Sequence, residues 1–179
     1  HPECFYRGLR LLGVDGTRFS VPNSQAHAAR WKKARSRRGP AAFAQIDLVV
    51  VSELGLHNPV AAAIGTEQES EMALARDVFG SVPPQSLALG DRLYGVGKCI
   101  AAVIPLWLDQ GSHFLFRVRS NLKRRVHKRF RDGSAWVTIS TTDGRRLEVR
   151  EIVDKLRTRQ GKTVEVRLWT SLLDAVLYP

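Results

Sequence analysis

The chain has 179 residues, enough for one domain with a sizeable hydrophobic core, and 44% of them are hydrophobic. Its 28 lysines and arginines outnumber 17 aspartates and glutamates, and the net charge of +11 favours a polyanionic partner. No segment approaches the roughly 18 consecutive apolar residues of a membrane span. Cys4 and Cys99 lack a zinc-binding spacing. We therefore expect a soluble, cytoplasmic protein with free thiols.

The hydrophobic pattern predicts a mixed α/β order of elements. Thr66 and Glu69 have the spacing of a capping box and begin a predicted helix, and Pro105 should kink a second helix or mark its late start. The basic segment from Thr17 to Pro40 shows no such pattern and is predicted to be a long loop. Strands are predicted at residues 9–15, 43–52, 60–64, 86–91 and 114–118, and helices at about 66–79 and 96–110.

After Ser134 the hydrophobic pattern becomes the alternation typical of β-strands. The Asp143-Gly144 pair between two alternating segments is a strong hairpin signal, and further strands are predicted at 147–153 and 164–169. We therefore divide the chain into a core (1–119), a basic linker (120–132), an inserted β-rich subdomain (133–170) and the truncated start of a return to the core (171–179).

Two aspartates close predicted strands, Asp15 after residues 11–14 and Asp91 after residues 86–90. A carboxylate held by the rigid backbone of a strand end can bind a hard cation. Mg²⁺ is usually held by one or two carboxylates together with waters and substrate phosphates. The alternative for each residue alone is a turn or a helix cap. The two aspartates together favour a divalent-cation site over a turn or a helix cap.

Three segments carry a family resemblance: Asp15-Gly16-Thr17, the run from Asp91 to Gly95, and the run from His113 to Asn121. Together they resemble the DDE transposases of bacterial insertion sequences, in the insertion sequence 4 family, and the likeness extends from about Leu9 to Tyr178. The resemblance implies a ribonuclease H-like mixed sheet with an inserted β-rich subdomain. It also implies that Asp15 and Asp91 are catalytic residues that lie side by side and bind Mg²⁺, with Mn²⁺ as a substitute.

The implied reaction is metal-dependent phosphoryl transfer, in which transposon ends are cleaved and joined to double-stranded target DNA. The family's third acid is a Glu in a helix with a Tyr, Arg, Glu and Lys signature, and that signature does not occur in this sequence. We therefore expect a fragment, with the third acid beyond Pro179 and no activity of its own. Glu148, Glu151 and Glu165 fall in predicted strands of the insertion and are interpreted as surface residues.

Two basic clusters, one around Trp31 and one after Phe116, predict contacts with the phosphate backbone of DNA. The resemblance adds Arg92 and Tyr94 beside the metal or the DNA, although Tyr94 can equally pack at a helix start. A solvated basic surface is the alternative for both clusters. The candidate DNA-binding residues are Lys32, Lys33, Arg35, Arg92, Tyr94, Arg117, Arg119, Lys123, Arg124 and Arg125.

Two other functions stay open from the sequence. One is a nuclease of the ribonuclease H fold that cuts nucleic acid without strand transfer, and the other is a non-catalytic nucleic-acid-binding remnant of a transposase. For the transposase, the resemblance is compatible with a homodimer on DNA and with association with the bacterial nucleoid.

Overall fold

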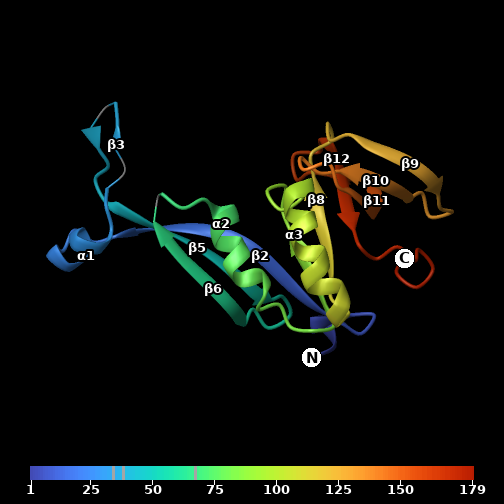
Figure 1. Cartoon of the computed structure of the whole chain (residues 1–179), viewed down its shortest axis with the longest axis horizontal. Helices are drawn as coiled ribbons and strands as arrows, with labels where there is room; N and C mark the ends of the chain where they lie inside the picture. The colour runs from blue at the N-terminus through green and yellow to red at the C-terminus, as the bar shows by residue number, and fades with distance from the viewer. Residues whose placement is uncertain (34, 38, 67) are drawn as a thin grey trace.

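A computed structural model of the chain describes residues 1–33, 35–37, 39–66 and 68–179. Within these residues, ten strands form one mixed sheet, and a two-stranded ladder and a short helix project from one end of it (Figure 1). The helices are α1 (Gln25–Arg30), α2 (Glu71–Phe79) and α3 (Gly97–Trp107), with 3-10 turns at Pro2–Cys4 and Leu108–Gln110. The strands are β1 (Phe5–Tyr6), β2 (Leu9–Val21), β3 (Arg35–Ser36), β4 (Gly39–Pro40), β5 (Ala44–Glu53), β6 (Pro59–Thr66), β7 (Ser86–Gly90), β8 (His113–Val118), β9 (Arg124–Arg129), β10 (Ala135–Ser140), β11 (Arg146–Arg157) and β12 (Thr163–Thr170).

The strand order across the sheet is β6-β5-β2-β7-β8-β12-β11-β10-β9, and β1 pairs with the start of β2. β2, β5 and β6 form an antiparallel meander, whereas β2, β7 and β8 are parallel to one another. Parallel neighbours need a crossover connection, usually a helix. α2 supplies the crossover between β6 and β7, and α3 the one between β7 and β8.

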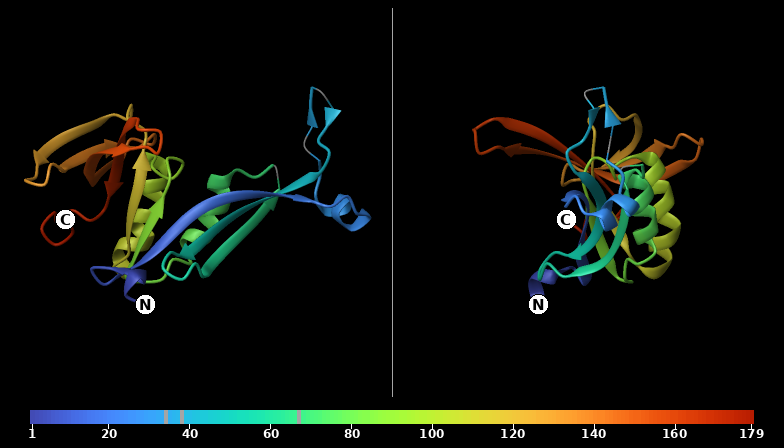
Figure 2. Two further views of the ribbon diagram at one scale, coloured as in Figure 1. Left: turned by 180° about the vertical axis from the view of Figure 1, so that it is seen from behind. Right: turned by 90° about the vertical axis from the view of Figure 1, so that its left-hand side faces the viewer.

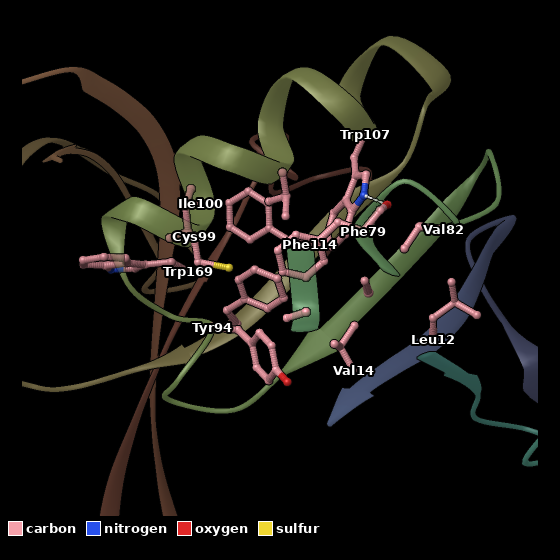
Figure 3. Close-up of a cluster of buried hydrophobic side chains, with 14 of the residues drawn as sticks. Leu12, Val14, Phe79, Val82, Tyr94, Cys99, Ile100, Trp107, Phe114 and Trp169 are labelled. Atoms are coloured by element: carbon pink, nitrogen blue, oxygen red, sulfur yellow. Dashed lines mark hydrogen bonds between the residues drawn. The ribbon is translucent and has the colours of Figure 1, made fainter. Parts of the chain in front are cut away.

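The main hydrophobic core lies between the sheet and helices α2 and α3, which cover the same side of the sheet (Figure 2). Side chains alternate between the two faces of a strand, so Leu12 and Val14 of β2 point to the helices. Phe79 of α2 and Trp107 of α3 pack edge to face with ring centroids 5.6 Å apart. The Trp107 indole N–H donates to the Phe79 carbonyl at 2.9 Å (Figure 3). These contacts fix the two helices against each other.

The five strands and two helices predicted before residue 119 are confirmed, with shifted boundaries. Pro105 lies in the last turn of α3, which ends at Trp107, and the 3-10 turn Leu108–Gln110 follows directly. The capping residue of α2 is Ser70, whose hydroxyl accepts from the Ala73 amide at 3.2 Å. None of the helices in the described part of the chain is long and apolar enough to cross a membrane. Cys4 and Cys99 are buried free thiols, as predicted.

The predicted loop from Thr17 to Pro40 is wrong. β2 continues through Asp15 to Val21, and α1, β3 and β4 follow it. The extension of β2 pairs with β5 as far as Val21↔Ala44. Its side chains are mostly exposed on both faces, so hydrophobic alternation is absent. Backbone pairing with β5, which the sequence pattern does not reveal, forms this part of the strand.

The β-rich segment after Ser134 continues the main sheet, because β12 pairs antiparallel with β8 from Arg167↔Val118 to Thr170↔Leu115. The mixed sheet of the described residues therefore has ten strands, where the sequence predicted five. The segment 120–132, expected to be a linker, contains β9, which pairs with β10 at the sheet edge. β9 is exposed along its whole length and carries many cations, so it lacks the apolar signal of a strand.

Candidate functional site

Asp15 lies in β2, and Asp91 directly follows β7, the neighbouring parallel strand, at the same level of the sheet. The last parallel pair of β2 and β7 is Val14↔Gly90, and each aspartate is the next residue of its chain. Neighbouring strands are about 4.8 Å apart, so the two side chains start from adjacent backbone positions. The register brings together the two acids that the sequence singled out.

The surroundings of the two aspartates differ in two respects from the expected strand ends. Asp15 is inside β2, and both carboxylates are exposed to solvent. One oxygen of Asp15 accepts from the Gly16 amide at 2.9 Å, and one oxygen of Asp91 accepts from the Leu93 amide at 2.7 Å. These local bonds orient each carboxylate with backbone donors that do not depend on distant packing.

The donor set suits a hard cation. Two carboxylates with access to solvent match the usual protein contribution to a Mg²⁺ site, in which waters and phosphates complete the coordination. Among the described residues, no group of three or more His, Cys, Asp or Glu side chains is placed to hold an ion by itself. Asp15 and Asp91 would hold the cation, and the remaining ligands would come from water and a phosphate substrate.

Tyr94 is a buried polar residue that lies three residues after Asp91. It is 0% exposed and belongs to the main core, so it cannot contact DNA in this structure. The DNA-binding role proposed for Tyr94 is therefore wrong, and the alternative, packing at a helix start, holds. Burial raises the Tyr94 pKa, and the hydrogen bond to Glu71 and the charges of Glu71, Asp15 and Asp91 raise it further.

Glu71 is a residue that the sequence analysis missed. It begins α2, and its Oε1 accepts from the Tyr94 hydroxyl at 2.9 Å. A Cβ atom on Gly16 would overlap the Glu71 carboxylate, so that carboxylate lies directly over the backbone beside Asp15. The sequence assigned Glu69 to a capping box with Thr66, and its carboxylate accepts from the Thr66 amide at 3.0 Å. Nothing in the sequence singled out Glu71. Only the packing of α2 on β2 identifies it.

The basic residues on and beside β9 form a cationic edge. Lys123, Arg125 and Arg146 line a hollow of about 270 Å³, and His127 and Thr138, which bond each other, also line it. Arg124 differs, because its guanidinium forms an ion pair with Glu151 at 2.7 Å. The positive charge of Arg124 is therefore largely neutralised within the protein.

The other candidate DNA contacts are scattered. Arg92 and Arg119 are exposed. Arg117 is half-buried, and its Nε has no hydrogen-bond partner among the described residues. Lys33 donates to the Ala42 carbonyl at 2.8 Å, and Lys32 lines a hollow beside α1. The side chain of Arg35 lies outside the described residues.

The three acids of the predicted insertion have different environments. Glu148 and Glu165 are exposed, as expected. Glu151 is only 4% exposed and accepts from the Trp169 indole N–H at 3.1 Å, so its interpretation as a surface residue is wrong. Its partners Arg124 and Arg167 neutralise it. Glu151 stabilises the junction of β9, β11 and β12.

We expect the hollow beside β9 to contribute to salt-dependent binding of duplex DNA. Neutralising Lys123, Arg125 and Arg146 together to Gln should flatten the slope of log affinity against log salt by up to about 2.7, at roughly 0.9 per lost phosphate contact. Fluorescence anisotropy with a labelled duplex at several salt concentrations measures the slope. The control is a triple variant that loses the same charge elsewhere, Arg7→Gln with Arg76→Gln and Lys98→Gln. Equal slopes for the two triple variants would contradict the assignment.

Comparison with known proteins agrees with the sequence resemblance. A family model described as a transposase DDE domain matches residues 6–175. Over 185 aligned positions, covering 99% of this chain, the sequence is 26% identical to the transposase InsG for insertion sequence element IS4 of Escherichia coli (strain K12), and the chain spans 41% of that relative's length. Among solved structures, an endonuclease V from Bacillus subtilis aligns with 89% of this chain and 64% of its own length, at 13% identity and a TM-score of 0.33.

Proposed function

Because the chain belongs to the family of transposase DDE domains, we propose that it is part of the catalytic domain of a DNA transposase. The proposed reaction is cleavage at the ends of a mobile element and transfer of the cut strands into double-stranded target DNA. The observation that carries the proposal is the register of β2 and β7, which sets Asp15 beside Asp91.

The proposal includes a ribonuclease H-like core. Its support is the order of the five central strands, in which the first and fourth along the chain, β2 and β7, are adjacent and parallel. This adjacency is what the family resemblance implies for the strands that carry the two acids. β9–β12 would then be the insertion, continuous with the core sheet.

Each proposed role follows from the position of a residue in this chain. Asp15 and Asp91 would hold Mg²⁺ or Mn²⁺, and the bound ion would supply charge stabilisation at the transferring phosphate and a lowered pKa for a bound water or hydroxyl. Arg92, exposed in the turn after Asp91, is placed to contact a phosphate of the DNA. Lys123, Arg125 and Arg146 hold the duplex along the β9 edge.

This segment alone is proposed to bind the cation without cleaving DNA. Two carboxylates can hold one ion but leave a second ion of a two-metal site poorly held. Of the three glutamates of the β11–β12 region, Glu151 is paired with two arginines, and Glu148 and Glu165 are exposed on their strands.

The test is cleavage by a transposase that contains this segment in its full length. With Mg²⁺ or Mn²⁺ and DNA carrying the element's ends, Asp91→Asn should abolish nicking and strand transfer while DNA binding is retained. Asp77→Asn, an exposed carboxylate on α2, is the matched control and should retain both. Wild-type nicking by the Asp91→Asn protein would overturn the proposed function.

A further inference from the structure

Asp15, Asp91 and Arg117 form one row across three neighbouring parallel strands. The last residues of β2, β7 and β8 that pair in parallel lie at one level of the sheet. Each of the three charged residues directly follows its member of that level. Neighbouring strands are about 4.8 Å apart, so the backbone of Arg117 is one strand away from that of Asp91 and two strands away from that of Asp15.

The side chain of Arg117 lies on the face of the sheet opposite to α2 and α3 (Figure 2). Its two neighbours along β8 belong to the core under the helices, and side chains alternate along a strand. The same alternation puts Asp15 on the face of Arg117, because Val14 points to the helices. Leu89, two residues before Asp91, packs in the smaller hydrophobic cluster on this face. The arginine therefore shares one face of the sheet with the aspartates.

Arg117 lacks the partners that other arginines in this half of the chain have. Arg150 pairs with Asp132, and Arg167 pairs with Glu151. Among the described residues, no hydrogen bond or ion pair engages Arg117, and its Nε is buried without an acceptor. A buried N–H without an acceptor is unfavourable. The guanidinium therefore has hydrogen-bonding capacity that the described part of the chain does not use.

The nearest carboxylate in the row does not satisfy this arginine. Asp91 accepts from the Leu93 amide at 2.7 Å, and no ion pair joins it to Arg117 within the residues that the structure describes. An ion pair would neutralise the carboxylate and weaken its attraction for a cation. A phosphate that a cation holds through one oxygen has other oxygens free, and a guanidinium binds phosphate oxygens through charge-assisted hydrogen bonds. The row thus offers two acids to a cation and a guanidinium to its phosphate.

We propose that Arg117 binds the DNA phosphate held by the cation of Asp15 and Asp91. The inference rests on the proposed function, because the phosphate reaches Arg117 through that cation. The contact differs from those of the β9 edge, which hold the duplex whether or not a cation is bound. A cation and a phosphate that bind together strengthen each other's binding by the same factor. Without a phosphate, the positive charge of Arg117 repels the cation.

The experiment measures how much Mn²⁺ raises the affinity of this chain for a labelled DNA duplex, by fluorescence anisotropy at constant ionic strength. The wild type should bind the duplex about tenfold more tightly with Mn²⁺, within the usual range of coupling between two ligands. Arg117→Gln should lose most of this gain. Arg76→Gln, which removes an exposed charge from α2 on the opposite face, is the matched control and should keep it. An unchanged gain in Arg117→Gln would overturn the proposal.

A titration with Mn²⁺ alone distinguishes phosphate binding from a structural role of Arg117. Without DNA, Arg117→Gln should bind Mn²⁺ at least as tightly as the wild type, because the substitution removes a positive charge beside the cation. A weakened Mn²⁺ affinity would assign Arg117 to the structure of the site and overturn the proposal. If Arg117→Gln fails to fold, Arg117→Met, which keeps the apolar stem, replaces it with the same expected results.

The double variant Asp15→Asn with Asp91→Asn separates this inference from the proposed function. If the double variant loses the gain from Mn²⁺ and Arg117→Gln keeps it, the role of Arg117 is wrong and the proposed cation site stands. If the wild type itself gains no DNA affinity from Mn²⁺, the proposed cation site does not hold a DNA phosphate, and the inference falls with it.

Discussion

Replacing Asp15 and Asp91 together by asparagine is expected to lower the Mn²⁺ affinity of this chain by at least about a hundredfold. Losing an outer-shell partner of a metal ligand already costs about 10–100-fold in affinity, and the double variant loses both direct ligands. The fold should survive, because an asparagine oxygen can still accept the Gly16 and Leu93 amide bonds. Both side chains are exposed, so the free energy of unfolding should change by no more than about 0.5 kcal/mol each.

The measurement is a calorimetric titration with MnCl₂ at low ionic strength, with thermal unfolding as a check on the fold. The control is the double variant Asp77→Asn with Asp109→Asn, which removes the same charge from exposed helical positions. Each single variant, Asp15→Asn or Asp91→Asn, should show part of the loss, because the two carboxylates share one ion and their effects are not additive. Equal affinities for the two double variants would mean that the ion binds elsewhere.

Glu151→Gln is expected to lower the free energy of unfolding by about 3 kcal/mol, the lower end of the cost of breaking a buried charge pair. Glu151 is buried between β9 and β12, and its carboxylate meets Arg124 at 2.7 Å and Arg167 at 3.6 Å. The amide removes the negative charge and leaves two cations facing each other. The side chain of Arg167 is only 11% exposed, so water cannot fully replace the lost partner.

Denaturant unfolding followed by circular dichroism measures this effect. Glu148→Gln is the control, because Glu148 is an exposed glutamate on the same strand. Its substitution should change the free energy of unfolding by no more than about 0.5 kcal/mol. If the two variants have the same stability, the pairing of Glu151 with the arginines does not support the β9 edge.

The local elements could be predicted because they depend on short-range periodicity. The apolar stripes of α2 and α3 and the alternation in β5 and β8 were sufficient to place these elements along the chain. The two wrong predictions, a loop from Thr17 to Pro40 and a linker over 120–132, have one cause. The second half of β2 and the whole of β9 are exposed strands without apolar alternation. These segments are strands because their backbones pair with β5 and β10. The pairing partners are separate strands, and the local sequence pattern does not show which strands will pair.

The residues of the candidate site can be divided in the same way, into those that local sequence indicates and those that only the fold brings together. The sequence by itself singled out Asp15 and Asp91, because a motif of a few consecutive residues carries each of them. Only the tertiary structure decided which other side chains stand beside them. Packing of α2 places the Glu71 carboxylate over Gly16, and burial removes Tyr94 from the predicted DNA contacts. The folded sheet also brings Arg124 of β9 to Glu151 of β11. These outcomes depend on contacts between residues distant in sequence, and local patterns carry no information about such contacts.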